Sequence, residues 1–384
     1  MSEKMVATTF QGLEQVLATE LEQLGAGGIE IRKRAVAFEG DKVLLYAANM
    51  HLFTAVRILL PVASFQADSP DELYDRARDI PWENWLEIQT TFAITFAIHS
   101  EYFTHTQYAA LRLKDAIVDR FRSNGGERPS VDTNNPDIPL HLHINQDQVT
   151  VSLNSSGHSL HKRGYRQTVH KAPLSEVLAA GMIRLSGWDM QVPLYDPMCG
   201  SATLPIEAAL AAYRIAPGLI RNDFAFKHWK DYDPGIFKQL LLQAQSDVLL
   251  DRKLIITGSD MQSRVLAQAA ENVKAAKLED RISLFPKRFE DADPPKFPGI
   301  AIINPPYGER MKKDDMIAFY RAMGDRMKQA YKGWKVWVLT SNLEAAKFIG
   351  LKPSRKIVLF NGPLECRFLC FDIYEGSKKY QNEN

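Results

Sequence analysis

The feature that most constrains this chain is a short apolar run at residues 300–303 that stops abruptly at Asn304, Pro305, Pro306 and Tyr307. Four apolar residues bounded in this way predict a buried parallel strand. Open α/β sheets bind their ligands at the carboxyl ends of such strands. We therefore expect the four residues after the run to form a catalytic loop.

The carboxyl-terminal half alternates between expected strands and expected helices. The strands fall near 192–195, 254–257, 282–285, 300–303 and 335–339, and the helices near 173–184, 203–213, 262–276 and 315–331. This alternation predicts an α/β fold with a mostly parallel, doubly wound sheet. Two further runs, 356–360 and 367–374, meet at Asn361-Gly362-Pro363 and predict a terminal hairpin.

The amino-terminal half has shorter elements. A strand at 5–10, a helical stripe ended by glycines, a strand at 29–38 and a helix at 42–50 capped by Asp41 predict a small βαβ-type unit. A strand at 91–98, a helix at 106–122 and a hairpin of 140–144 with 149–153 follow. The half therefore reads as α+β.

The first strand of the doubly wound part ends in a turn of small residues that opens a helix. The turn consists of Asp196, Pro197, Met198, Cys199, Gly200, Ser201, Ala202 and Thr203. Small residues let a ligand approach the backbone, and a helix amino terminus offers unpaired N–H groups. The turn has neither the Gly-Lys-Ser/Thr of a P-loop nor the three-glycine dinucleotide fingerprint. A tight turn with no ligand is the alternative.

The second strand ends in Thr257-Gly258-Ser259-Asp260, followed by Met261. An acid at this place usually binds a ribose hydroxyl pair. Asp260 lies 64 residues after Asp196 (260 − 196), far more than the roughly 20 of the dinucleotide pattern. An insertion at about 214–250 explains the excess if it packs outside the sheet. Asp260 could instead only cap the next helix.

Two adjacent prolines make the loop after residue 303 rigid and rich in acceptors, because each proline lacks an N–H donor. Such a loop suits an amino group attached to a heterocycle. The Asn304 side-chain oxygen and the Pro305 carbonyl could accept its two N–H bonds while Tyr307 stacks on the ring. A proline turn without a role is the alternative.

The net charge of +1 gives no general signal for a polyanionic partner. Locally, residues 148–175 contain no acidic residue, and the expected helix at 106–122 displays basic residues. The candidates for RNA contact are Lys162, Arg163, Arg166 and Lys171 in the first stretch and Arg112, Lys114, Arg120 and Arg122 in the second. Phosphate contact and a solvated linker are both readings of the first stretch.

Little in the sequence supports a disulfide-bonded, metal-binding, membrane or secreted protein. Cys199, Cys366 and Cys370 match neither a disulfide framework nor a zinc set, and the histidines form no convincing metal site. No apolar run approaches the roughly 18 residues of a membrane span, and the amino terminus does not resemble a signal peptide. We expect a cytoplasmic monomer without a metal or a membrane contact.

The three motifs, in this order and ending in Asn-Pro-Pro-Tyr-Gly-Glu-Arg, resemble class I S-adenosylmethionine-dependent methyltransferases that act on exocyclic amines. Lys-Asp-Ala-Ile-Val-Asp-Arg at 114–120 and His-Lys-Arg-Gly-Tyr-Arg at 161–166 resemble the bacterial subgroup that carries a THUMP RNA-binding domain, similar to 23S rRNA guanine-N2 methyltransferases. The resemblance implies a ferredoxin-like segment at 1–60, a THUMP domain at 61–160 and a Rossmann-like, seven-stranded methyltransferase domain at 161–384.

The resemblance also assigns roles. Residues 196–203 would hold the methionine part of S-adenosylmethionine, and Asp260 would hold the ribose. Phe289 would contact the adenine, and Met261 and Asn304 would also contact the cofactor. Residues 304–307 would hold the target base. Ala202 departs from the family's usual glycine, which we expect to be tolerable only at negative φ.

Three competing functions remain. A tRNA guanine-N2 methyltransferase shares every motif, and a DNA adenine-N6 enzyme shares Asn-Pro-Pro-Tyr but not the THUMP-like half. A non-catalytic RNA-binding or assembly protein is the alternative of another class.

Overall fold

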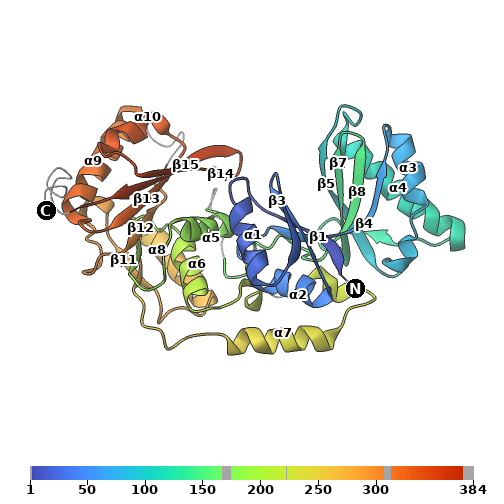
Figure 1. The fold of residues 1–384 in the computed structure, drawn as a ribbon, viewed down its shortest axis with the longest axis horizontal. Helices are drawn as coiled ribbons and strands as arrows, with labels where there is room; N and C mark the ends of the chain where they lie inside the picture. The colour runs from blue at the N-terminus through green and yellow to red at the C-terminus, as the bar shows by residue number, and fades with distance from the viewer. Residues whose placement is uncertain (1, 167–173, 222, 307–312, 375–384) are drawn as a thin grey trace. The chain divides into compact units, whose positions relative to one another are not determined.

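The computed structural model describes residues 2–166, 174–221, 223–306 and 313–374 (Figure 1). The chain forms two compact units. The first comprises Met1–Thr9, Ala18–Leu160 and Arg221–Leu242, and the second comprises Phe10–Leu17, His161–Ile220 and Gln243–Asn384. Part of the expected insertion, residues 221–242, thus belongs to the first unit, although the sequence analysis placed it in the methyltransferase domain. The boundaries at residues 60 and 160 stay predictions.

The first unit contains one eight-stranded sheet. Its strands are β1 (Glu3–Thr8), β2 (Gly27–Arg32), β3 (Ala35–Gly40), β4 (Arg57–Gln66), β5 (Thr91–His99), β6 (Ser130–Val131), β7 (Ile138–Asn145) and β8 (Gln148–Asn154). They lie in the order β2-β3-β1-β4-β8-β7-β5-β6. The pairings of β5 with β6 and β7 are parallel and the others are antiparallel. The α+β prediction is confirmed.

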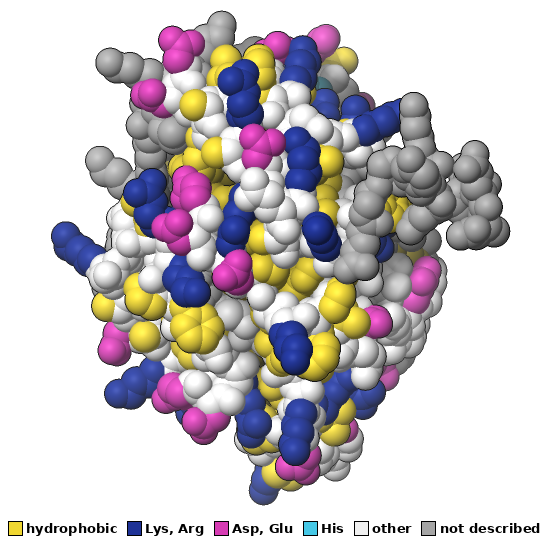
Figure 2. All heavy atoms as spheres, turned by 90° about the vertical axis from the view of Figure 1, so that its left-hand side faces the viewer, with side chains coloured by type: hydrophobic (Ala, Val, Ile, Leu, Met, Phe, Trp, Pro, Cys, Tyr) yellow, Lys and Arg dark blue, Asp and Glu magenta, His cyan; other side chains and the backbone are white. Residues whose placement is uncertain are grey.

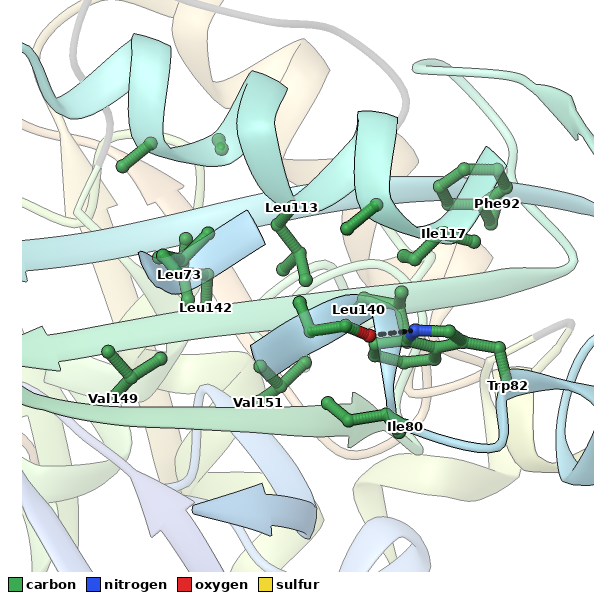
Figure 3. Packing of buried hydrophobic residues seen from close by; sticks show 14 of the residues in the cluster. Leu73, Ile80, Trp82, Phe92, Leu113, Ile117, Leu140, Leu142, Val149 and Val151 are labelled. Carbon is green, nitrogen blue, oxygen red and sulfur yellow. Dashed lines mark hydrogen bonds between the residues drawn. The ribbon is translucent and has the colours of Figure 1, made fainter. Parts of the chain in front are cut away.

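Four helices accompany these strands: α1 (Glu14–Gln23), α2 (Lys42–His51), α3 (Pro70–Arg78) and α4 (Thr106–Gly125). Asp41 caps α2 by accepting a hydrogen bond from the Leu44 N–H, as expected. One core lies between α3, α4 and the sheet, where Leu113 and Ile117 point toward Leu140 (Figure 3). The Trp82 indole, 0% exposed, closes this core and donates to the Ala77 carbonyl at 2.7 Å.

One expectation for this unit is wrong. The single strand expected at 29–38 is a hairpin of β2 and β3, which turns at Lys33 and Arg34. Strand β4 and helix α3 were not predicted from the sequence. Helix α3 nevertheless begins with ordinary helix-start residues, because Ser69 caps it and Pro70 occupies its first turn.

The second unit contains a seven-stranded sheet. Its strands are β9 (Leu194–Asp196), β10 (Ile256–Asp260), β11 (Ser283–Pro286), β12 (Ile300–Ile303), β13 (Lys335–Thr340), β14 (Arg355–Asn361) and β15 (Leu364–Asp372). The order is β11-β10-β9-β12-β13-β15-β14. Strands β9 to β13 run parallel, and the final hairpin is antiparallel. The predicted Rossmann-like sheet with a terminal hairpin is confirmed.

The helices of the carboxyl-terminal half are α5 (Glu176–Leu185), α6 (Thr203–Ala212), α7 (Pro234–Ser246), α8 (Ser263–Ala275), α9 (Lys313–Ala330) and α10 (Leu343–Ala346). The sheet order places β9 between β10 and β12. Since the chain proceeds outward from β9 in both directions, this is the switch point at which doubly wound sheets bind ligands. The three predicted motifs follow these three neighbouring strands.

The face of the molecule shown in Figure 2 has no large patch of one charge. On the face in Figure 2, Lys and Arg alternate with Asp, Glu and hydrophobic side chains. Within the described ranges, no helix is long and apolar enough to cross a membrane, and no group of three or more His, Cys, Asp or Glu could hold a metal.

Candidate active site

Strand β9 delivers Asp196 into the interior of the second unit. Its side chain is 2% exposed, and Oδ1 accepts a hydrogen bond from the Met198 backbone N–H at 3.1 Å. Burial raises the pKa of Asp196 to about 8, and the charge of Asp260 adds to the rise. The charge on Asp196 therefore depends on what binds beside it.

After Asp196 the chain turns tightly and enters α6 at Thr203. The Ala202 N–H donates to the Cys199 carbonyl at 2.8 Å. Gly200 and Ala202 both have left-handed backbone, with φ of 51° and 64°. The expectation of negative φ at Ala202 is wrong. A left-handed alanine costs roughly 1–2 kcal/mol, which the bonded turn around it must offset.

The turn has open space beside Gly200 and is closely packed where Cys199 meets Gly258. A Cβ added at Gly200 would meet no atom within 4 Å. A Cβ added at Gly258 would lie 3.0 Å from the Cys199 sulfur, so that this thiol packs closely on β10. Burial raises the pKa of Cys199 well above its usual value. Cys199 is therefore a neutral packing group, and only its backbone suits a ligand.

Asp260, at the end of β10, joins the first two motifs. Its Oδ2 accepts the Gly200 N–H at 3.2 Å, and its Oδ1 accepts the Gln262 N–H at 2.9 Å. The residue at the amino-terminal cap of α8 is Gln262, not Asp260. Capping alone therefore does not account for Asp260, whose carboxylate fixes the turn and still has lone pairs for a hydroxyl pair.

Asn304 follows β12, whose four residues are all buried. Its Oδ1 is buried, and among the described residues it has no hydrogen-bond partner. An unsatisfied buried carbonyl costs roughly 1–3 kcal/mol, so that its retention calls for an explanation. Pro305 is buried and Pro306 is exposed, while Tyr307 lies outside the described residues. The Asn304 Oδ1 atom can therefore accept a hydrogen bond from a ligand bound beside it.

The motifs line a single cavity of about 1350 Å³ within the second unit. The predicted cofactor and catalytic residues on its walls are Asp196, Pro197, Met198, Cys199, Gly200, Ser201, Thr203, Asp260, Met261, Phe289, Asn304, Pro305 and Pro306. Met261 is 61% exposed, whereas Phe289 is 5% exposed. The Phe289 ring stacks on Tyr331 with centroids 6.1 Å apart, which leaves it little freedom to stack on an adenine.

Arg166 also lines this cavity, and its side chain forms hydrogen bonds there rather than facing solvent. Its guanidinium donates to Glu176 Oε1 at 3.0 Å, to Ser201 Oγ at 3.3 Å and to Thr203 Oγ1 at 3.1 Å. The two side chains of the ion pair are 14% and 5% exposed. The structure thus places Arg166, expected on RNA, against the turn after β9.

The Arg163 side chain is buried as well. It is 1% exposed and pairs with Glu207 on α6, which is 0% exposed, at 3.3 Å. The Tyr165 hydroxyl donates to the same carboxylate at 3.0 Å. A guanidinium enclosed in this way is not available to a phosphate, so that the expectation of RNA contact at Arg163 is corrected.

The predicted basic residues of α4 all have acidic neighbours. Arg112 pairs with Asp71, Lys114 with Asp115, Arg120 with Glu83 and Arg122 with Asp119, at 2.8, 2.6, 2.6 and 3.5 Å. The Arg120 guanidinium lowers the pKa of Glu83 to about 2. Lys162 is exposed, and Lys171 lies outside the described residues.

Asn272 of α8 is a further residue at the turn, which was not predicted from the sequence. Its Nδ2 donates to the Ser201 carbonyl at 3.0 Å, and the residue is 2% exposed. The signal was present, because Asn272 continues the apolar stripe of Leu266 and Ala269. A polar residue within a buried stripe indicates a specific partner.

The pattern described as "RMKL-like, methyltransferase domain" matches residues 163–369, more than half of the chain. The chain belongs to the RMKL-like methyltransferase family. A THUMP domain matches residues 67–154, and the RlmL ferredoxin-like domain matches residues 4–59. The expected resemblance is confirmed for both halves.

Relatives of this RMKL-like chain carry related names. It is 36% identical to a putative RNA methyltransferase of Synechocystis sp., over 96% of both chains. It is 38% identical to ribosomal RNA large subunit methyltransferase K/L of Syntrophotalea carbinolica, over 97% of this chain and 54% of that one. The chain thus spans about half the length of the K/L proteins that it matches.

Solved structures share the fold over the whole chain. A putative methyltransferase complexed with SAH has a TM-score of 0.88 at 31% identity, covering 98% of this chain and 99% of that one. A predicted N6-adenine-specific DNA methylase from Listeria monocytogenes reaches 0.86 at 31% identity, covering 98% and 97%. TrmN from Thermus thermophilus, at 20% identity and a TM-score of 0.67, shares the fold.

Proposed function

We propose that this RMKL-like enzyme transfers a methyl group from S-adenosylmethionine to the exocyclic N2 of a guanine in 23S rRNA. One observation carries the proposal: the buried Asn304 Oδ1, with no partner among the described residues, lies in the same cavity as the turn after β9 and Asp260. An amine would supply the missing donor.

The described residues fit the cofactor. The open space at Gly200 can take its methionine part, and the lone pairs of Asp260 can take its ribose hydroxyls. SAH accompanies a relative of this fold at 31% identity, which supports the same cofactor class here. When bound, S-adenosylmethionine supplies an electrophilic methyl group.

The loop after β12 would prepare the amine. A guanine amino group is a weak nucleophile because its lone pair is delocalised into the ring. Hydrogen bonds from its two N–H groups to Asn304 Oδ1 and the Pro305 carbonyl would localise that pair on nitrogen. Positioning in a buried cavity supplies much of the remaining acceleration, and the released proton can pass to water.

The RNA contacts belong to the proposal as well. A base inside a duplex cannot reach this cavity, so that the target must be unpaired or flipped out. The THUMP match, the exposed Arg122 and Lys162 and the partly exposed Lys114 support an RNA partner held through its backbone. Arg112 and Arg120 are candidates only if they leave their carboxylates.

The test combines nucleoside analysis with one variant. Mass spectrometry of rRNA and tRNA from a deletion strain should show loss of N2-methylguanosine from 23S rRNA. Loss from tRNA alone would favour the tRNA enzyme, and unchanged levels in both would contradict the proposal. In vitro, Asn304→Ala should abolish transfer and leave SAH affinity within about threefold, which corresponds to less than 1 kcal/mol. Asn84→Ala, at an exposed asparagine, is the matched control.

A further inference from the structure

The cavity is larger than one small-molecule ligand requires. Its volume of about 1350 Å³ exceeds the roughly 300–1,000 Å³ of ordinary small-molecule sites, which leaves room for a second ligand beside a cofactor. Part of its wall comes from segments outside every predicted motif. These are Phe10 near the amino terminus, Phe319 on α9, and the turn between β14 and β15 with Leu364.

Phe10 belongs to the second unit, and two glycines let its segment pack closely within that unit. Gly12 has φ of 92°, and a Cβ there would lie 2.5 Å from the Val358 carbonyl of β14. Leu13, which is 0% exposed, fits against Gly181 of α5, where a Cβ would lie 2.4 Å from the leucine Cδ2. The Phe10 carbonyl accepts the Leu13 N–H at 3.1 Å. Phe10 is therefore held by anchored neighbours.

Phe10 differs from the other aromatic residues of the wall. Phe289 stacks on Tyr331, and Phe319 meets Tyr320 edge to face at 5.8 Å. In the described part of the chain, the half-buried Phe10 ring has no aromatic partner. The nearby turn contributes Leu364, an apolar side chain that is 46% exposed. An unpaired ring at the wall of a cavity suits a flat, apolar ligand surface.

We propose that Phe10 is a binding residue for the target nucleobase, stacking on it while the amine meets Asn304. The inference rests on the proposed function, since it takes the ligand to be an unpaired RNA base. Stacking on an aromatic ring is how proteins commonly hold unpaired bases, and it tolerates every base because each has a π-face. Phe10 would therefore hold the base, and the loop at 304–306 would select the amine.

Steady-state transfer to unmethylated 23S rRNA tests the assignment with three variants. Phe10→Leu should raise KM for RNA roughly 5- to 150-fold, the range for loss of one base stack. Phe10→Tyr should stay within about threefold of wild type, because a tyrosine ring also stacks. Phe297→Leu, at a 61% exposed phenylalanine outside the cavity wall, should behave as wild type.

Calorimetry with SAH separates this assignment from the proposed function. All three variants should bind SAH as wild type does. An unchanged KM in Phe10→Leu would overturn the assignment, and so would weakened SAH binding or loss of folding in both Phe10 variants, since Phe10 would then be structural. Absence of transfer by the wild-type enzyme would instead overturn the proposed function.

Discussion

Arg166 Nη2 donates to Thr203 Oγ1 over 3.1 Å, and the same guanidinium binds Glu176 at 3.0 Å. The bond connects the residue before the undescribed stretch 167–173 to the first residue of α6. Asp260 holds Gly200 and Asn272 holds Ser201, so that side chains from three segments fix the turn. The turn is thereby set in shape before a ligand arrives, which lowers the ordering cost of binding.

Loss of Arg166 should therefore weaken cofactor binding. We expect Arg166→Met, combined with Glu176→Gln so that no carboxylate stays buried and unpaired, to lower SAH affinity about tenfold, or 1.4 kcal/mol. Calorimetry with SAH measures this, and RNA affinity measured in parallel should not change. Normal SAH binding together with weakened RNA binding would instead indicate that Arg166 contacts RNA.

Loss of Arg163 should act on stability. Arg163→Met leaves Glu207 buried without its cation and should lower the free energy of unfolding by about 3–5 kcal/mol. Adding Glu207→Gln should recover much of the loss, because the second variant removes the buried charge. Urea unfolding followed by circular dichroism gives both values. A single variant as stable as wild type would contradict the assigned ion pair.

Asp196 should make the ligand-free protein less stable as pH rises. Its folded pKa of about 8 lies above the roughly 3.9 of an unfolded aspartate, so that the folded state binds the extra proton between these values. The stability that this group contributes should be fully present below about pH 4 and be lost toward pH 8, by up to about 1.4 kcal/mol per pH unit. Asp196→Asn should flatten the profile measured by urea unfolding; an unchanged slope would show that another group causes it.

Electrostatic contact with RNA should be visible in the salt dependence of binding. Arg122→Ala and Lys162→Ala should each reduce the slope of log K against log salt by about one, if each neutralises a phosphate. Lys347→Ala is the control, at a side chain that is 69% exposed and paired with Glu344. Filter binding with 23S rRNA over a range of salt concentrations measures the slopes. Equal slopes in all three variants would place the RNA contacts elsewhere.

The sequence predicted the elements whose signals are local. The run at 300–303 and the turns after Asp196 and Asp260 each combine an apolar strand with small or rigid residues, and neighbouring strands bring them together without further information. The cap at Asp41 is equally local.

Contacts between residues far apart in the sequence could not be predicted in the same way. Arg163 and Glu207 are 44 residues apart, and nothing near Arg163 distinguishes a buried arginine from an exposed one. Ala202 adopts left-handed backbone because tertiary contacts override its local preference. Strand β4 was missed because it is defined by its partners, β1 and β8, rather than by strict alternation.

Strand β4 also has a consequence for dissecting the chain. It spans Arg57–Gln66, across the interval between the ferredoxin-like match at 4–59 and the THUMP match at 67–154. A fragment beginning at residue 67, where the THUMP match starts, would lack β4 and leave β8 with an unpaired edge. Such edges recruit other chains, so that an isolated THUMP fragment should aggregate. The two domains match separate sequence families, but β4 joins them in one sheet, and we expect them to fold together.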